Sequence, residues 1–314
     1  MTERQKGILA LLVVLVAWSL SSVFVKYLIH AGYGPHTQNF YRYAAGTAVL
    51  VPFLLRRFRR TAAWPSRRTL LWLLAATVPN LSHQICWTVS LNWIHPGLSS
   101  FLNKSSVLFA ALLAFTFYAE ERWLLRSKRY IAGLVLTLLG TIGLSVLRGD
   151  LNRMQANVGV GLALLAGLSW ATYSVMVKRP SGEVGSTVSF AIVGIYTTLV
   201  LLVIAIGWGE LGHWKRAPWQ ANAIMIFSGV LCIGAGHTFY YYAMQRLTVS
   251  VCTTVLLTTP MGTLWISRWL FGERMTAWQI VSGLVLILGG ILTLLAREKK
   301  EPSLIAQATE AAET

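Results

Sequence analysis

Hydrophobic residues occur along this chain in ten long runs separated by short polar segments. Each run is long enough to cross about 30 Å of hydrocarbon as an α-helix, and too long for a strand of a membrane β-barrel. The runs are Ile8–Ile29, Thr37–Leu55, Thr69–Leu91, Gly97–Ala119, Tyr130–Leu147, Val158–Val177, Thr187–Gly207, Gln220–Met244, Thr248–Leu270 and Ala277–Ala296. The pattern predicts an all-α integral membrane protein with ten transmembrane helices.

The composition supports this class. Hydrophobic residues make up 55% of the 314 positions and charged residues 12%, whereas soluble domains carry roughly 25% charged residues. A soluble globule could not shield so much apolar surface from water, and a disordered chain has the opposite composition. We therefore expect membrane lipid as a constant partner of this chain.

The net charge of +16 would suggest nucleic-acid binding in a soluble protein. Here the basic residues lie in short clusters between the hydrophobic runs, the largest in residues 56–68. Two thirds of the 27 Lys and Arg residues fall on one side if the N-terminus is cytoplasmic. The positive-inside rule then predicts that both termini are cytoplasmic. We expect no nucleic-acid partner, and we expect residues 301–314 to form a disordered cytoplasmic tail.

The two halves of the chain repeat each other. Trp18 and Lys26 recur 152 residues later as Trp170 and Lys178, and GLVLTLLG at 133–140 recurs as GLVLILGG at 283–290. We predict one five-helix repeat over residues 1–150 and a second over residues 151–300. Because five is odd, the second repeat enters the membrane from the opposite face. Inverted repeats of this kind are typical of transporters that bind substrate at the repeat interface.

The segment TTPMGTLWISRWLFGERMTAWQIVSGLVLILGG (258–290) resembles the end of a repeat in the EamA-type group of the drug/metabolite transporter superfamily. The first half resembles it less closely, because Ala119 and Glu120 precede Glu121 and no proline lies near Ser105. The resemblance extends over both repeats. It implies ten helices around a central cavity lined mainly by helices 1, 3, 4, 6, 8 and 9, and it implies the export of amino acids or related metabolites.

Lys104 lies several residues inside the fourth hydrophobic run, next to Asn103. An ionisable residue inside a membrane span costs free energy, and such a residue is a candidate for function. The sequence offers no acidic partner within a span, so we expect Lys104 to bind a substrate anion, with Asn103 beside it. The alternative is that its ammonium group snorkels to the interface. For Lys26, Arg42 and Arg268, which lie nearer span ends, snorkelling is the preferred interpretation.

Aromatic and polar residues recur at equivalent positions of the two repeats, with partners four residues apart that share a helix face. These pairs are His83 with Trp87, His237 with Tyr241, Trp18 with Ser22, and Trp170 with Ser174. Because the repeats are related by symmetry, we predict that these faces line one substrate cavity. The alternative for each residue is packing within the helix bundle. Two histidines without further ligands do not predict a metal site.

Two other features have structural interpretations. Glu121 and Glu273 end the fourth and ninth spans, and we expect them to pair with Arg122 and Arg274 or to brace neighbouring helices. The glycines on the fifth helix of each repeat allow close helix approach. We expect those helices to form packing surfaces or a homodimer interface.

The sequence lacks a P-loop, an HExxH motif and a GxSxG motif, so it predicts no ATPase, protease or hydrolase and no cofactor. We interpret the chain as a secondary transporter of the bacterial inner membrane that exports amino-acid-like or other carboxylate-bearing small metabolites. A transporter of neutral or cationic compounds and a membrane-embedded lipid-modifying enzyme are the alternatives.

Overall fold

The computed structural model of the protein describes residues 1–61, 65–90, 93–94, 96–147, 158–271 and 276–296. Every regular element in this part of the chain is a helix, as predicted. Glu273 and the predicted tail 301–314 lie outside the described residues. Of Ser22 and Arg268, the backbone is described but the side chain is not.

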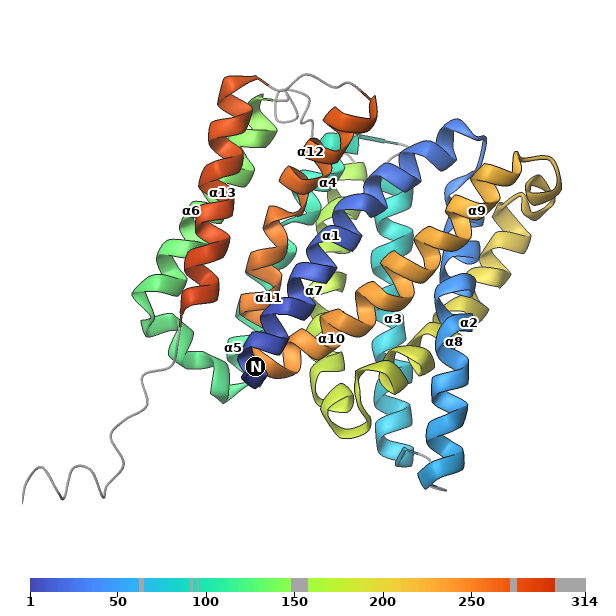
Figure 1. Cartoon of the computed structure of the whole chain (residues 1–314), viewed down its shortest axis with the longest axis horizontal. Coiled ribbons are helices and arrows are strands. Elements are labelled where there is room, and N and C mark those ends of the chain that lie inside the picture. Colours follow the sequence, from blue (N-terminus) through green and yellow to red (C-terminus); the bar gives the residue numbers. More distant parts are fainter. Residues whose placement is uncertain (62–64, 91–92, 95, 148–157, 272–275, 297–314) are drawn as a thin grey trace, which may run out of the picture.

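The helices follow the hydrophobic runs closely, with short 3₁₀ and π segments between some of them (Figure 1). The first half contains α1 (Glu3–His30), α2 (Pro35–Thr61), α3 (Arg67–Ser90), α4 (Pro96–Asn103), α5 (Ser106–Phe117), η1 (Ala119–Arg126) and α6 (Lys128–Leu147). The second half contains α7 (Val158–Val184), α8 (Ser186–Trp208), η3 (Leu211–Lys215), α9 (Trp219–Ser228), η4 (Gly229–Ala235), α10 (Gly236–Arg246), α11 (Val249–Val255), η5 (Leu256–Thr258), α12 (Thr259–Phe271) and α13 (Ala277–Leu295).

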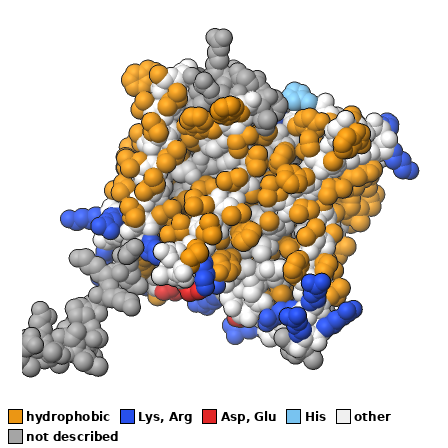
Figure 2. All heavy atoms as spheres, viewed as in Figure 1, with side chains coloured by type: hydrophobic (Ala, Val, Ile, Leu, Met, Phe, Trp, Pro, Cys, Tyr) orange, Lys and Arg blue, Asp and Glu red, His pale blue; other side chains and the backbone are white. Residues whose placement is uncertain are grey.

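Five helical stretches in the described part are long and apolar enough to cross a membrane by length and composition. They are α1, α7, α8, the continuous stretch Trp219–Arg246 and α13. Hydrophobic side chains cover most of the face in Figure 2, whereas Lys and Arg gather chiefly at its lower edge. This distribution is that of a multi-pass membrane protein.

The fourth and ninth runs are not single helices, contrary to the prediction. The fourth is broken at Lys104 and Ser105, where α4 ends and α5 begins. The ninth changes to a 3₁₀ turn at Leu256, which is the residue equivalent to Lys104 at the 152-residue offset. The amide of Ser105 bonds to the carbonyl of Leu102 at 3.0 Å, so the backbone stays hydrogen-bonded through the break. Discontinuous helices are a common feature of transporter binding sites.

The eighth run is interrupted by the π-helical segment η4, which packs against α2. Gly46 of α2 faces Gly229 and Gly234 of this segment, and an added Cβ at any of the three glycines would collide with backbone atoms of the other element. The three glycines therefore allow the two backbones to touch. This contact positions Arg42, one turn before Gly46, beside the π segment.

The two repeats interlock. The most extensive contacts join a helix of the first half to one of the second, namely α6 with α13, α3 with α7, α2 with α8, and α1 with α10 and α12. Gly133 and Gly289 lie between α6 and α13, where a Cβ would collide with the opposite helix. Figure 1 shows these two helices side by side. The glycine-rich fifth helices thus pack against each other within one chain.

Candidate functional site

A cavity of about 220 Å³ opens between the two broken helices and their neighbours. Its walls come from α1, α3, α7, the η4–α10 segment and both helix breaks, and also from α2. Apart from α2, these are the helices that the family resemblance implied. The residues predicted for the site that line this cavity are Trp18, His83, Trp87, Asn103, Lys104, Trp170 and His237.

Two tryptophans form the centre of the site. The rings of Trp18 and Trp170 meet edge to face, with centroids 5.3 Å apart. The indole nitrogen of Trp18 donates a 2.9 Å hydrogen bond to the carbonyl oxygen of Cys232 in the π segment. The π segment thereby fixes the orientation of the Trp18 ring.

Each symmetry-related histidine lies against the tryptophan of the other repeat. The centroid distance is 5.1 Å from His83 to Trp170 and 5.4 Å from His237 to Trp18. Nδ1 of His83 lies 3.0 Å from the carbonyl oxygen of Ala166, and Nδ1 of His237 lies 3.1 Å from that of Ile233.

Because a carbonyl oxygen can only accept, Nδ1 of each ring carries the proton and Nε2 of the neutral imidazole is an acceptor. His237 is 3% exposed, and its Nε2 has no hydrogen-bond partner among the described residues. Oδ1 of Asn103 is also buried without such a partner. The cavity therefore holds acceptors that a ligand with an O–H or N–H group could satisfy.

Lys104 lies at the break between α4 and α5 and lines the cavity. Its ammonium group forms no hydrogen bond or ion pair with the residues that the structure describes. His83 lines the same cavity. The snorkelling alternative is disfavoured, since the side chain faces the cavity.

Arg42 is a charged residue of the cavity that was not predicted from the sequence. It was expected to snorkel at a span end, but it is 5% exposed and lines the cavity. Its Nη2 donates to the hydroxyl oxygen of Ser21 at 2.5 Å, and its Nε has no acceptor among the described residues. α2 begins at Pro35, so Arg42 lies two turns inside the helix. Gln38, one turn earlier and also buried, is a sequence signal for this inward face.

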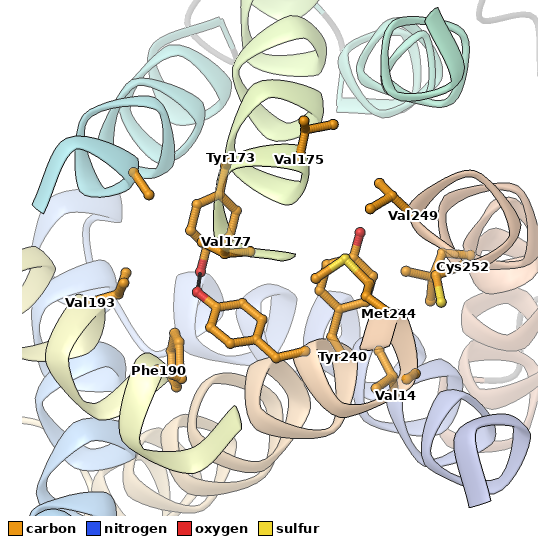
Figure 3. Close-up of a cluster of buried hydrophobic side chains, with 14 of the residues drawn as sticks. Val14, Tyr173, Val175, Val177, Phe190, Val193, Tyr240, Met244, Val249 and Cys252 are labelled. Carbon is orange, nitrogen blue, oxygen red and sulfur yellow. Dashed lines mark hydrogen bonds between the residues drawn. The ribbon is translucent and has the colours of Figure 1, made fainter. Parts of the chain in front are cut away.

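Two predicted residues lie in the core instead of the cavity wall. Tyr241 is fully buried, with its hydroxyl 2.5 Å from that of Tyr173. The hydroxyl of Ser174 is occupied by Tyr240 and by the backbone of its own helix. Tyr241 lies one turn, about 6 Å, beyond His237, and its ring meets that of Phe190 edge to face, 5.8 Å apart between centroids. Figure 3 shows Tyr173 and Phe190 in this buried cluster.

No carboxylate lies among the lining residues that the structure describes. A buried acid, Glu121, is engaged away from the cavity wall. Its carboxylate accepts from Lys178 at 2.8 Å, from the amides of Val249 and Ser250 at the start of α11, and from the Ser250 hydroxyl. The expected helix brace is therefore present, but the expected Arg122 pairing is not, because Arg122 donates to the carbonyl of Phe115.

The described residues contain no cluster of three or more His, Cys, Asp or Glu residues that could hold a metal ion. The chemistry available at the cavity is thus that of two cations, two imidazoles, three indoles and a few amide and hydroxyl groups. Such groups bind a small polar molecule through charge, hydrogen bonds and stacking.

The model of the EamA-like transporter family matches residues 5–146 and residues 157–296. A WAT1-related protein of Arabidopsis thaliana is 22% identical over 90% of this chain and 82% of its own. The uncharacterized transporter YdfC of Bacillus subtilis is 26% identical over 69% of this chain and 68% of its own. An uncharacterized transporter of Haemophilus influenzae is 22% identical, covering 61% of this chain and 63% of its own.

Among solved structures, one crystal structure of a protein superposes with a TM-score of 0.77 at 17% identity. The superposition covers 94% of this chain and 100% of that chain. At this identity the likeness establishes a shared fold. The two matched segments correspond to the two halves of the chain that the internal repeat defines.

Proposed function

The chain belongs to the EamA-like transporter family, and on this premise we propose that it is a ten-span secondary transporter built from two inverted five-helix repeats. The repeats correspond to residues 1–150 and 151–300, and both termini are cytoplasmic. Support comes from the ten hydrophobic runs, the odd number of spans per repeat and the one-sided distribution of basic clusters. The bacterial relatives and the same charge bias favour the bacterial inner membrane.

The substrate is a small metabolite that carries a carboxylate, such as an amino-acid-like compound. One observation carries this proposal. Arg42 and Lys104 bring two cations to one cavity whose described lining residues include no carboxylate. A buried charge without a counter-ion is costly, and a substrate carboxylate supplies the missing charge. The orphan acceptors on His237 and Asn103 suit a hydroxyl or N–H group of the same molecule.

Export is the proposed direction, following the family resemblance of the sequence. The broken helices support a mechanism in which α4–α5 and α11–α12 change their tilt at the breaks, so that the cavity opens alternately to each side. We also propose that two copies of the chain form a homodimer through their outer surfaces. Since the glycine faces of α6 and α13 are used within the chain, a second copy would contact other parts of these helices.

Exposure of sealed vesicles to a metabolite pool, followed by mass spectrometry of their contents, tests the substrate class. Vesicles containing the protein should accumulate or release carboxylates relative to empty vesicles. Methyl esters of the same compounds should be transported much less. If neutral or cationic compounds are moved and carboxylates are not, the carboxylate proposal is wrong.

Transport of neutral or cationic compounds is the second candidate, because the faces of Trp18 and Trp170 suit a cationic or flat apolar group. The two cations that line the cavity oppose a positively charged substrate. The lipid-modifying enzyme is the least supported alternative, since the named relatives are transporters.

A further inference from the structure

The two cations enter one cavity from different elements. The guanidinium of Arg42, on α2, donates to the Ser21 hydroxyl of α1. Lys104 comes from the break between α4 and α5, whose backbone at Asn103 packs on Gly167 of α7. Rings of both repeats line the same cavity, with Trp170 5.9 Å from His237 and 5.1 Å from His83 between ring centroids.

The elements that carry the two cations also differ. Arg42 comes from α2, which packs on α8 and η4, whereas Lys104 comes from the break between α4 and α5, both of which pack on α7. Among the described residues, Arg42 donates to the neutral Ser21 hydroxyl and has no carboxylate partner, and the ammonium group of Lys104 forms no hydrogen bond. Each cation thus needs an anionic partner of its own.

The charge balance distinguishes between kinds of carboxylate substrate. A zwitterionic amino acid brings no net charge, so its binding would leave the net positive charge of the cavity unchanged and add an ammonium group. A single carboxylate would neutralise one cation and leave the other. A molecule with two carboxylates would neutralise both, which favours it because uncompensated charge in a low-dielectric cavity is costly.

We propose that the preferred substrate is a dicarboxylate whose two anionic groups are held apart, one by Arg42 and the other by Lys104. This inference rests on the proposed function and narrows it. The planar guanidinium suits one carboxylate through paired N–H donors, and the ammonium of Lys104 binds the other as a point charge. The spacer packs against the indole and imidazole rings that line the same cavity.

Two acceptors without a described donor favour a hydrogen-bond donor on the spacer of the substrate. Nε2 of His237 and Oδ1 of Asn103 are buried acceptors without a described donor. A buried acceptor that receives no hydrogen bond costs free energy. A hydroxyl or N–H group on the spacer would donate a hydrogen bond to one of these acceptors. Dicarboxylates with a hydroxyl or N–H substituent should therefore bind better than unsubstituted dicarboxylates of equal length.

Uptake by proteoliposomes containing the full chain tests the inference with a matched series. The compounds are linear dicarboxylates of increasing chain length, their monoamides and their diamides. For the best length we expect the wild-type rate to fall about tenfold or more with each carboxylate converted to an amide. A hydroxyl on the spacer should raise the apparent affinity. A phosphate monoester of similar size, which carries its two charges on one group, should compete poorly.

Two variants assign the anchors. Arg42→Met and Lys104→Met should each lower dicarboxylate uptake about tenfold while changing monoamide uptake little, so that the preference for the second carboxylate disappears. Arg59→Met and Lys128→Met change exposed cations outside the cavity and should keep the wild-type preference. If the cavity variants do not reach the membrane, the wild-type series alone still decides.

The outcomes distinguish a failure of the two-anchor inference from a failure of the proposed carboxylate transport. Equal wild-type transport of dicarboxylates and monoamides, with poor transport of diamides, would overturn the two-anchor inference and leave the carboxylate transporter intact. Strong competition by the phosphate monoester would also overturn it, in favour of a single dianionic group. Equal transport of all three classes would refute the proposed function itself.

Discussion

Trp18 and Trp170, which occupy equivalent positions in the two repeats, touch each other at the cavity with their rings inclined by 76°. The symmetry that relates the repeats therefore passes between these two rings. The contacts of His83 with Trp170 and of His237 with Trp18 repeat this relation on either side, at nearly equal distances. The aromatic frame of the site is a product of the duplication.

The two tryptophans differ in one hydrogen bond, and this difference can be measured. Trp18→Phe removes the donor to the carbonyl of Cys232 and should lower stability by about 1 kcal/mol beyond the loss of ring area. Trp170→Phe, whose indole makes no hydrogen bond to the described residues, is the matched control. Thermal unfolding in detergent should show the larger decrease for Trp18→Phe. Equal decreases would mean that the bond to the π segment contributes nothing.

Lys104→Met keeps the aliphatic stem and removes the charge. Because a partly buried cation without a partner among the described residues has gone, the variant should fold at least as stably as the wild type in the absence of substrate. Transport of carboxylates should fall steeply, mainly through apparent affinity, and Lys104→Arg should restore it only in part. Uptake assays with parallel melting curves check both statements. Wild-type carboxylate uptake by Lys104→Met would show that the lysine is not an anchor.

The two histidines should matter for transport through different contacts. His83 bonds across helices to Ala166 of α7, whereas His237 bonds to Ile233 one turn earlier in its own stretch of helix. His83→Ala and His237→Ala should both lower transport at normal membrane levels. His83→Ala should also reduce stability, by about 1 kcal/mol more than His237→Ala, because it removes an interhelical bond. Normal transport by both variants would return them to a packing role.

Glu121 joins the two repeats through a buried carboxylate. Lys178 lies 2.8 Å from it with 14% of the lysine side chain exposed, and the amides at the start of α11 share it. Glu121→Gln should destabilise the protein by roughly 3 kcal/mol, since Lys178 loses the buried one of its two carboxylate partners and keeps only the exposed Glu120 at 3.3 Å. The double variant Glu121→Gln/Lys178→Met should be less destabilised than the sum of the single variants. Strict additivity in the melting data would contradict this coupling.

The topology is open to direct test. Tags at the N-terminus, after Arg60 and at the C-terminus should all be labelled from the cytoplasmic side, because the basic clusters lie at these points. Selective labelling of intact cells and of inverted vesicles gives the readout. Labelling of any of the three sites from outside the cell would rule out the inverted-repeat arrangement.

The sequence was informative where duplication or charge stood out from the hydrophobic background. Trp18, Trp170, His83 and His237 could be predicted as neighbours because each residue type recurs in the second half, 152 residues on for Trp and 154 for His. Lys104 could be predicted because a charge inside a span is costly.

Other features left weaker signals. Arg42 was misinterpreted because its distance from the span end depended on where the helix begins, and helix ends are uncertain by a turn from sequence. The breaks at Lys104 and Leu256 were missed because neither site itself is a glycine or a proline, although polar residues flank both, such as Asn103 and Ser105 at the first. Tyr241 shared a helix face with His237, but periodicity cannot show at which depth a cavity ends.

The cations of the site belong to one half of the chain. At the 152-residue offset Arg42 corresponds to Gly194 and Lys104 to Leu256, so the aromatic frame is duplicated and the positive charge is not. A fully symmetric site would offer any ligand two equivalent poses, related by the pseudo-dyad, with equal energy. With both charges on the first half, that degeneracy is lifted. A bound molecule therefore has a single preferred orientation in the cavity. An unsymmetrical ligand enters and leaves the cavity in one defined orientation.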